Sequence, residues 1–405
     1  MPRVTGLHGD ACIVGIAERP AERKFTGTPT LTLEQWAALA ADALADAGIP
    51  SADVDGIVCA GDVAEASLFV PATIAEYCGW SVNFAERIDL GGATAVGMVW
   101  RAAAAVELGL CEVVVCATVG QPRPPAPGAR SGINPRAVYG ASSMEWGSPQ
   151  AEFDVPYGNV AQNGGYAMYA QRYHDLYGWD ERGRAKIASD QRVSACANPS
   201  AVFHGQPISV DDVLASRVIA APLHLLEIVM PCTGGAAFVV TTADRARDLA
   251  HRPVAVAGFG ERLTHKTPTY AAEMPRTPVR DAAGRAFAMA GIAPADVDMV
   301  QLYDCYTITA LLTIEDSGFC GTGEGLDFVR EHDLSYRGDF PCNTHGGQLG
   351  MGQTGLSGGT SHVIEGVRQV QGRADARQLA AHDVAYVTGT GGVMSEQAAV
   401  VLTGV

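Results

Sequence analysis

The sequence of 405 residues is poor in aromatic side chains and in long apolar runs. Aromatic residues make up only 7% of the chain, whereas 47 residues are glycine. This balance favours helices packed closely on a sheet over a β-sandwich, so we expect an α/β fold. No run approaches the roughly 18 apolar residues of a membrane span, and the N-terminus lacks the apolar stretch of a signal peptide. We therefore expect a cytoplasmic protein that does not associate with membranes.

Positive charge is scarce as well. The chain has 28 Lys and Arg against 44 Asp and Glu, which gives a formal net charge of −16 at pH 7. A nucleic-acid partner would require clustered basic side chains to neutralise its phosphates, so the composition argues against one. An anionic substrate would need a local basic patch.

Cysteine and histidine lack the spacings of metal or disulfide sites. The ten cysteines form no CxxC pair, and several lie inside apolar runs such as GIVCAG. This pattern favours buried free thiols in a reducing compartment. The segments HGDAC, HDLYG and EHDL also lack ligand spacing, so we expect no metal. The segments GTGGVM and GMGQTG do not have the spacing of a nucleotide-binding loop, which argues against hydride transfer.

What the sequence does contain is an internal repeat at an offset of 243 residues. Residues 46–58 read DAGIPSADVDGIV, and residues 289–300 read MAGIAPADVDMV. Each copy predicts a helix that ends on a glycine, then a turn containing proline, then a buried strand. We interpret the repeat as a duplication of one α/β unit.

Each half contains a second unit of helix and strand after a glycine-rich turn, in residues 91–120 and 346–392. The segment at about 121–221 is richer in Pro, Gly, Tyr and Trp, which is typical of an elaborated cap that covers a substrate. We therefore expect a first half of residues 1–251, including this cap, and a second half of residues 252–405.

Several segments, in this order along the chain, resemble the thiolase superfamily. They are ACIVGIAERP, GIPSADVDGIV, CTGGAAFVVTTADRARDL, VQLYDCYTITALLTIEDSGFCGTGEG, NTHGGQLGMGQTG and VTGTGGVMSEQAAVVL. The sequence is most similar to sterol-carrier-protein-type thiolases and to lipid-transfer-protein aldolases that break down steroid side chains. The resemblance implies two duplicated, mixed five-stranded sheets in an αβαβα layered arrangement, with the active site where the halves meet.

The resemblance also shows that the thiolase catalytic groups are missing. Thiolases carry a nucleophilic Cys at a helix N-terminus, where the helix dipole lowers the thiol pKa, but the matching turn here, DLGGATAVGM, has Gly91. The His that serves as base in thiolases is matched by Gln353, which takes up no proton at neutral pH. The second thiolase Cys falls on Thr388 or a neighbour. No acyl-enzyme is expected.

One motif points to a different chemistry. Where thiolases bind an ordered water through Asn or His, this chain has Tyr303 at the start of the motif YDCY, and the steroid side-chain aldolases are similar in opening the motif with Tyr. A phenol can donate a hydrogen bond to a developing oxyanion or transfer a proton. Those aldolases also carry a Tyr near the position of Gln353, which this chain lacks.

The candidate catalytic residues are Tyr303, His345 and Gln353. His345 lies in a predicted tight turn. Because histidine side chains in general titrate near neutrality, it suits a general acid or base, and it also suits a residue that caps the backbone. Gln353 suits a hydrogen bond to a thioester or a hydroxyl, or a structural amide. Tyr303 would otherwise be a core tyrosine. Cys305 and Cys342 are expected to be buried and structural.

The glycine-rich turns are the candidate substrate-binding segments. Their backbone can approach a substrate closely and offer N–H groups to a thioester oxygen. The residues we assign to this role are Gly91, Gly92, Gly347, Thr390, Gly391 and Gly392.

We expect an enzyme that acts on acyl-CoA and makes or breaks a carbon–carbon bond, first of all by retro-aldol or aldol cleavage of a β-hydroxyacyl-CoA. One alternative is a thiolase or acyltransferase with another nucleophile, and a second is a non-catalytic scaffold subunit. The CoA thioester is the substrate, and no cofactor is expected. The resemblance further implies a homodimer, and a small partner protein with a zinc ribbon and an OB-fold that contributes acyl-CoA binding.

Overall fold

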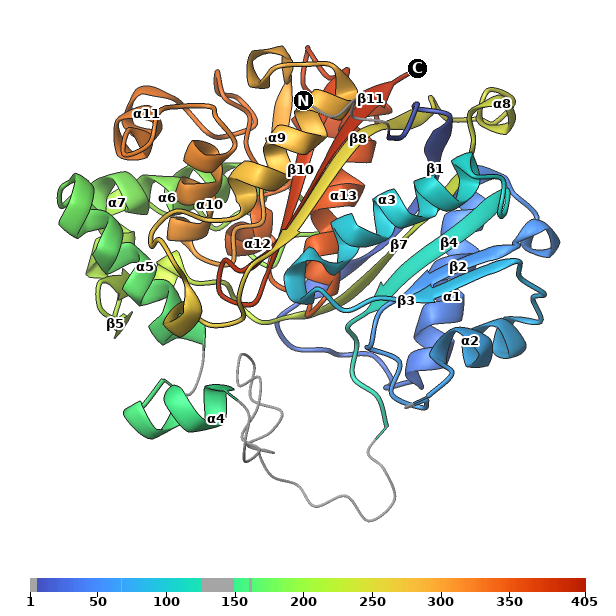
Figure 1. The fold of residues 1–405 in the computed structure, drawn as a ribbon, viewed down its shortest axis with the longest axis horizontal. Helices are drawn as coiled ribbons and strands as arrows, with labels where there is room; N and C mark the ends of the chain where they lie inside the picture. Colours follow the sequence, from blue (N-terminus) through green and yellow to red (C-terminus); the bar gives the residue numbers. More distant parts are fainter. Residues whose placement is uncertain (1–5, 67, 125–148, 160–161) are drawn as a thin grey trace.

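The computed structural model describes residues 6–66, 68–124, 149–159 and 162–405 (Figure 1). Within these residues, one mixed sheet has the strand order β3-β2-β4-β7-β1-β8-β11-β10-β9. The first half contributes β1 (Ala11–Glu22), β2 (Gly56–Cys59), β3 (Phe84–Arg87), β4 (Val113–Val119) and β7 (Thr233–Thr242). The second half contributes β8 (Val254–Leu263), β9 (Met299–Gln301), β10 (Val384–Gly391) and β11 (Glu396–Gly404).

The two halves join through a short antiparallel pairing of β1 with β8. Cys12 pairs with Ala255 and Ile13 pairs with Val254, whereas β1 pairs with β7 along most of its length. The predicted division after residue 251 falls in the connection between α8 (Ala243–Ala246) and β8.

The resemblance implied five strands in each half, and the second half departs from this. It has four strands among the described residues, and where the first half pairs β3 with β2, it makes a single bridge between Val300 of β9 and Cys342. Pro341 precedes the bridge, and Asn343 follows it at a φ of +53°. A proline has no N–H to donate and a positive φ turns the backbone, so the ladder stops after one residue pair.

The repeat in the sequence is also a repeat in structure. β1 and β8 begin 243 residues apart, at Ala11 and Val254. The helices α1 (Thr32–Ala47) and α9 (Val279–Ala290) end at the same offset, each on a glycine in the left-handed region. Such a residue closes a helix without the steric strain that a Cβ would bring. In both copies of the unit, the helix therefore ends on the glycine that the sequence predicted.

A glycine in each duplicated strand lets the following helix pack closely. A Cβ on Gly15 of β1 would lie 2.2 Å from the carbonyl oxygen of Ala43 in α1. A Cβ on Gly258 of β8 would lie 2.3 Å from the carbonyl oxygen of Ala286 in α9. Only glycine fits at either position, because both neighbours are backbone atoms that cannot rotate away.

The helices complete a layered αβαβα arrangement (Figure 1). α3 (Thr94–Glu107) and α13 (Ser357–Val370) pack on each other between the halves, and apolar side chains of both lie in one core with strands of both halves. On the outside, α1 covers the sheet of the first half and α9 covers that of the second. The remaining helices outside the cap are α2 (Val70–Cys78), α10 (Thr307–Asp316), α11 (Gly325–Glu331) and α12 (Gly347–Gly350).

The described part of the predicted cap is mainly helical, and residues 125–148 and 160–161 lie outside the described residues. Its elements are α4 (Pro149–Phe153), α5 (Gln162–Tyr177), α6 (Glu181–Ala197), α7 (Val210–Ala215) and the strands β5 (Val218–Ala220) and β6 (Leu223–His224). A fully buried ion pair anchors the cap, with Arg184 Nε at 2.9 Å from Glu227 Oε1. The Thr307 hydroxyl of α10 donates to the same oxygen at 2.9 Å, which ties the cap to the second half.

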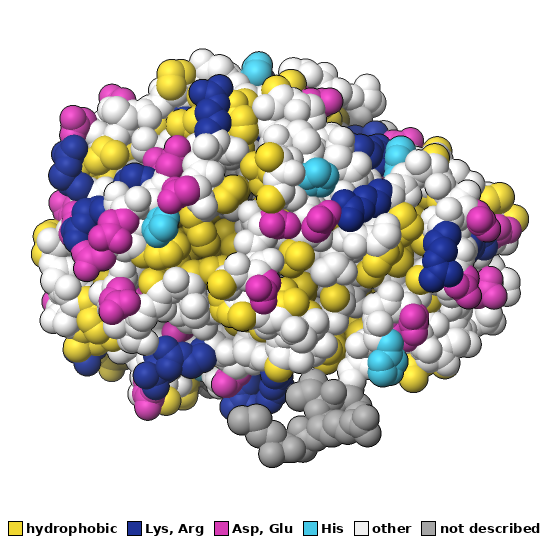
Figure 2. Space-filling view, turned by 90° about the horizontal axis from the view of Figure 1, so that it is seen from above, with side chains coloured by type: hydrophobic (Ala, Val, Ile, Leu, Met, Phe, Trp, Pro, Cys, Tyr) yellow, Lys and Arg dark blue, Asp and Glu magenta, His cyan; other side chains and the backbone are white. Residues whose placement is uncertain are grey.

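Charged side chains of both signs are interspersed on the face shown in Figure 2. All ten cysteines lie in described residues, and all are free. No group of three or more His, Cys, Asp or Glu side chains in the described ranges is arranged to hold a metal ion. Across those same ranges, every helix is too short or too polar to cross a lipid bilayer.

Asp62 connects the ends of two strands of the first half. One carboxylate oxygen accepts a hydrogen bond at 2.6 Å from the N–H of Val119, the last residue of β4. The other oxygen is buried and has no hydrogen-bond partner among the described residues. Burial raises the pKa of Asp62 from 3.8 to about 6, despite the opposing effect of the Val119 N–H and of Arg87. The folded state therefore loses stability as the pH rises from about 4 to about 6, because it resists an ionisation that the unfolded chain allows.

We predict that Asp62→Asn raises the free energy of unfolding by about 1–2 kcal/mol at about pH 7, because the amide oxygen still accepts from Val119 and no charge is buried. At about pH 4 the native Asp62 is already protonated, so the gain should be close to zero. Urea unfolding at both pH values measures the difference. The exposed Asp248 provides a control, Asp248→Asn, in which we expect no such pH dependence. An equal gain at both pH values in Asp62→Asn would contradict the prediction.

Candidate active site

A cavity of about 300 Å³ lies where the N-terminal end of α3 meets the ends of β9 and β10. Five of the predicted site residues line it, namely Gly91, Gly92, Tyr303, Thr390 and Gly392. The other lining residues are Gln162, Tyr166, Cys305, Gly355 and Leu356. A separate cavity of about 340 Å³ beside Tyr177 and Asp316 contains none of the predicted residues.

The backbones of the two halves touch at the glycine turns. A Cβ on Gly92 would lie 2.2 Å from the Tyr303 hydroxyl and 2.3 Å from the carbonyl oxygen of Thr390. Gly91, at a φ of +54°, begins the turn that leads into α3, and a Cβ there would lie 3.1 Å from the Cα of Gly391. The absence of side chains lets the N-terminal end of α3, with its partial positive charge, reach the pocket.

Tyr303 lies two residues beyond the end of β9, and its side chain is only 2% exposed. Its backbone N–H donates to the Thr388 hydroxyl at 3.2 Å, which fixes the main chain against β10. Its phenol oxygen accepts a hydrogen bond from the Gln353 amide at 3.3 Å. Because the amide is the donor in this bond, the O–H of the phenol is not used in it. The structure thus brings together Tyr303 and Gln353, two of the three predicted catalytic residues.

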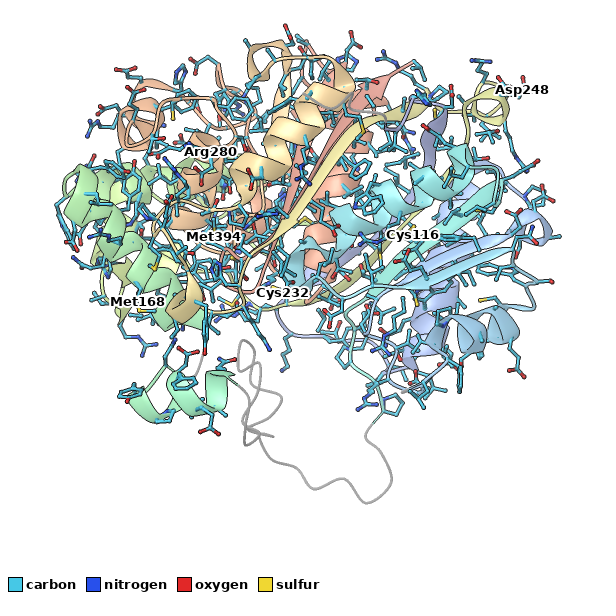
Figure 3. The ribbon with its side chains drawn as sticks, viewed as in Figure 1. Cys116, Met168, Cys232, Asp248, Arg280 and Met394 are labelled. Carbon is cyan, nitrogen blue, oxygen red and sulfur yellow. The ribbon has the colours of Figure 1, made fainter. Side chains whose placement is uncertain are left out.

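Gln353 is held by main-chain bonds on both sides. Its N–H donates to the carbonyl oxygen of Met230 at 2.9 Å, and its own carbonyl accepts from the N–H of Cys232 at 2.8 Å. Cys232 is labelled in Figure 3. The same figure labels Met394, a fully buried residue in the turn between β10 and β11. A side chain on so firmly bonded a backbone keeps a fixed position for its amide.

His345 does not line the pocket. Its side chain is 1% exposed, and neither ring nitrogen has a hydrogen-bond partner among the described residues. The ring meets that of His362 edge-on at a centroid distance of 5.0 Å, and His362 in turn lies 6.1 Å from the Tyr303 ring. Burial lowers the pKa of His345 well below its usual value, and His362 adds to this effect. His345 therefore contacts His362 and not the pocket, so it is not placed to act directly as an acid or base on a ligand.

Gly347 and Gly391 also lie outside the pocket lining. A Cβ on Gly347, which has a φ of +60°, would lie 2.2 Å from Oδ2 of Asp304, so this glycine makes room for a carboxylate. A Cβ on Gly391 would lie 2.0 Å from the carbonyl oxygen of Leu90. Both glycines allow close packing of the segments that form the pocket, rather than facing the cavity.

Comparison with known proteins identifies the family. Residues 260–404 match the family described as Thiolase C-terminal domain-like. A steroid side-chain-cleaving aldolase of Thermomonospora curvata is 35% identical over 395 residues, which cover 95% of this chain and 96% of that protein. The 17-hydroxy-3-oxo-4-pregnene-20-carboxyl-CoA lyase of Mycobacterium tuberculosis is 36% identical over 394 residues, which cover 95% of this chain and 97% of that protein. The chain belongs to the thiolase superfamily. Its relatives place it with the aldolases and lyases of that superfamily, and it is an enzyme.

Solved structures agree with this assignment. The structure described as Ltp2-ChsH2(DUF35) aldolase has a TM-score of 0.85 and 31% identity, and the match covers 99% of each chain. An acetyl-CoA acetyltransferase of Syntrophomonas wolfei has a TM-score of 0.66 and 14% identity, over 98% of this chain and 99% of that one, and shows the fold alone.

In this member of the thiolase superfamily, the positions that the resemblance matched to the catalytic groups of thiolases lie together. Gly91 lines the pocket, and Gln353 bonds to the Tyr303 hydroxyl inside it. Of the segment matched to the second thiolase Cys, Thr390 lines the pocket, while the Thr388 hydroxyl is bonded to the main chain of Tyr303. Positions 91, 353 and 390 therefore lie at or beside one pocket.

Five pocket residues were not among the predicted site residues, and two of them, Tyr166 and Cys305, carry groups that could take part in chemistry. Tyr166 comes from α5 of the cap, stacks on Tyr306 at 4.1 Å and donates to the carbonyl oxygen of Gly392 at 3.3 Å. Burial, and then nearby Cys305, raise its pKa well above the usual value. Cys305 is buried as expected, but it also lines the pocket, and burial raises its pKa to about 12. The sequence did contain a pattern that could have pointed to Tyr166. Tyr166, Tyr169 and Tyr173 repeat at helical spacing, which predicts a helix in the cap with one face of tyrosines.

We predict that Gly92→Ala lowers the free energy of unfolding by about 1–3 kcal/mol, because the new methyl group overlaps the Tyr303 hydroxyl and the Thr390 carbonyl. Urea unfolding monitored by circular dichroism measures the change. Gly284→Ala in α9 is the matched control, since a Cβ there meets nothing within 4 Å, and we expect it to gain about 0.5–1 kcal/mol from helix propensity. A Gly92→Ala protein as stable as the wild type would show that the two segments are not in tight contact.

Proposed function

We propose that this enzyme cleaves a β-hydroxyacyl-CoA by a retro-aldol reaction. The observation that carries the proposal is the place of the Tyr303 hydroxyl, in the pocket between Gly92 and Gln353, with Gly91 where a thiolase has its nucleophile. These groups suit a reaction that needs hydrogen bonding and proton transfer but no covalent acyl-enzyme. The names of the aldolase and lyase relatives support the same reaction.

In a retro-aldol cleavage, a base takes the proton of the β-hydroxyl and the bond between the α and β carbons breaks. The β carbon leaves as a ketone or aldehyde, and the electron pair becomes a thioester enolate, which is protonated at the α carbon. The β carbon is oxidised to a carbonyl and the α carbon is reduced by the same electron pair, so the step balances without a redox cofactor, and the proton taken from the hydroxyl balances the one given to the α carbon. We assign proton transfer to Tyr303. The amide of Gln353 supports this role, because its hydrogen bond to the phenol oxygen holds that oxygen in place at the pocket.

The enolate needs hydrogen-bond donors at the thioester oxygen, and we assign this role to the glycine turns. The N–H of Gly91 donates to the Asp89 carboxylate at 3.2 Å, so it is engaged. Gly92 and Gly392 both line the pocket and are the remaining candidates from the two turns. The N-terminal end of α3 adds a partial positive charge at the same place.

The alternative of a thiolase with another nucleophile has less support. Cys305 is the one cysteine that lines the pocket in the described residues, and its pKa of about 12 keeps it a thiol at neutral pH. The scaffold alternative is also less well supported, because the pocket has donors and a phenol within reach of a ligand and the relatives named as enzymes match nearly the whole chain.

The acyl group that we propose is of the steroid side-chain type. One relative is named for steroid side-chain cleavage and the other for a pregnene carboxyl-CoA. The pocket offers Tyr166 and Leu356 beside the polar groups, so apolar surface lies next to the groups assigned to the reaction. A bulky apolar acyl group could lie against Tyr166 and Leu356 while its hydroxyl lies near Tyr303.

We predict that Tyr303→Phe lowers kcat by about 100-fold or more, the scale seen when one acid, base or oxyanion donor is removed. KM should change little, because the interaction belongs to the transition state. Folding should be nearly unaffected, since only a hydroxyl is lost. Steady-state kinetics with β-hydroxyacyl-CoA esters, and the mass of the products, measure both parameters and identify the reaction.

Tyr157 supplies a matched control, because its side chain is 85% exposed and Tyr157→Phe should leave kcat unchanged. A folded Tyr303→Phe protein with wild-type kcat would remove Tyr303 from the mechanism. Products of thiolysis in place of a ketone or aldehyde would overturn the proposed reaction itself.

We further propose a small acyl-CoA-binding partner of the zinc-ribbon and OB-fold kind, and a homodimer. The solved relative is named as an aldolase of Ltp2 with ChsH2(DUF35), and a net charge of −16 leaves this chain few basic side chains for the phosphates of CoA. The edge strand β3, half of whose residues are exposed, offers a surface for pairing two copies.

We predict that the chain co-expressed with the product of a neighbouring gene of that kind cleaves acyl-CoA faster than the chain alone, because the partner supplies part of the CoA contact. Size-exclusion chromatography with light scattering measures the stoichiometry, and kinetics of both preparations measure the gain. A monomer that binds CoA tightly and turns over at the same rate without a partner would contradict both proposals.

A further inference from the structure

The main chain on both sides of Tyr303 is held by buried polar side chains. On one side, Asn343 accepts from the N–H of Leu302 at 2.7 Å and donates to the Leu302 carbonyl at 2.9 Å. On the other side is Asp304, whose side chain is fully buried. Its carboxylate accepts from the N–H groups of Gln348 and Leu349, at 2.7 and 3.2 Å, at the beginning of α12. A carboxylate bonded to two backbone N–H groups is strongly fixed.

A histidine from a third segment completes this arrangement. His362 lies on α13, is fully buried, and places Nε2 at 3.2 Å from Oδ1 of Asp304. The same Nε2 lies 3.4 Å from the amide nitrogen of Gln348 in α12, so the His362 ring contacts both the Asp304 carboxylate and the Gln348 side chain. The His362 ring lies 6.1 Å from the Tyr303 ring. The same helix also approaches the phenol directly, because a Cβ on Gly359 would lie 3.6 Å from a ring carbon of Tyr303.

We propose that Asp304 and His362 form a buried pair that fixes the orientation of Tyr303, which makes His362 a positioning residue for the carbon–carbon cleavage. This inference rests on the proposed function for its catalytic consequence. The pair joins the segment after β9, the beginning of α12 and the middle of α13. The first of these segments carries Tyr303, and α13 packs against its ring. His362 acts through Tyr303 and does not line the pocket.

The burial of the pair explains why loss of one member affects the geometry. Without His362, the Asp304 carboxylate keeps its bonds to α12 but loses its link to α13, so the buried side chain and the main chain beside it are held less firmly. A displacement of about 1 Å in a reacting group can lower a rate by about 100-fold. We therefore expect kcat to respond to His362 more strongly than KM does.

The test compares His362→Leu, which removes the polar ring nitrogens, with His362→Gln, whose amide can still form a hydrogen bond with Asp304. We expect kcat for the β-hydroxyacyl-CoA to fall by about 10- to 100-fold in His362→Leu, with KM within about twofold, and to be largely retained in His362→Gln. In a Tyr303→Phe background, His362→Leu should cause no further loss, because the two residues act as one unit. His204→Leu, at an exposed histidine, is the matched control and should leave kcat unchanged.

A second readout does not depend on activity. In protein labelled with 3-fluorotyrosine, the fluorine resonance of Tyr303 is identified by its absence in Tyr303→Phe. We expect this resonance to shift or broaden in His362→Leu and to stay in place in His362→Gln and His204→Leu. Circular dichroism and the melting temperature establish that each variant is folded.

Each outcome bears on one of the two proposals. If the wild type cleaves the substrate and a folded His362→Leu keeps wild-type kcat, the positioning role is overturned and the retro-aldol function stands. If the wild type cleaves no β-hydroxyacyl-CoA, the function is overturned, and an unmoved Tyr303 resonance in His362→Leu overturns the positioning role as well. If His362→Leu does not fold, Asp304→Asn takes its place under the same criteria. If neither variant folds, the pair serves stability and the positioning role is rejected.

Discussion

The pocket depends on the close approach of two stretches of backbone, Gly91–Gly92 from the first half and Thr390–Gly392 from the second. No side chain separates them, so the N-terminal end of α3 comes within reach of the residues that follow β9. Tyr303 fits in the space left beside this contact, with its hydroxyl against Gly92 and its main chain bonded to β10. A shared core around α3 and α13 holds the two halves in this relation. The chemistry assigned to the phenol is thus set by the packing of the whole molecule.

The two halves repeat one helix-to-strand unit, and they differ at the segments beside the site. The first half ends its sheet with the paired strand β3, whereas the second replaces that strand with the bridge at Cys342 and the turn at Asn343. The loss of regular pairing is useful here, because it frees the Asn343 side chain to bond both backbone groups of Leu302. The segment after β9 is therefore held by side chains where its counterpart in the first half is held by a strand.

The layered fold, the repeat and half of the pocket lining could be predicted from the sequence. Gly91, Gly92, Thr390, Gly392 and Tyr303 lie at the ends of duplicated elements, and the ends of such elements converge in a doubled fold. Tyr166 could not be placed in the same way, because it belongs to the cap, which has no copy to locate it. The Asp304–His362 pair was missed for another reason, since its members are 58 positions apart in different elements and only the packing of α13 brings them together. His345 had the right residue type and the right neighbourhood in sequence, but a short turn sets it facing His362 rather than the cavity.

The conformation of Gly91 has a consequence for the history of the protein. At a φ of +54°, with the Cα of Gly391 at 3.1 Å from a Cβ, position 91 resists any side chain, including the thiol that a thiolase carries there. A single codon change to cysteine would bring back the sulfur on a strained backbone pressed against the opposite turn, and Gln353 would still offer no base. Reversion requires simultaneous changes in segments far apart in the chain. The backbone at Gly91 therefore fits the proposed chemistry without an acyl-enzyme.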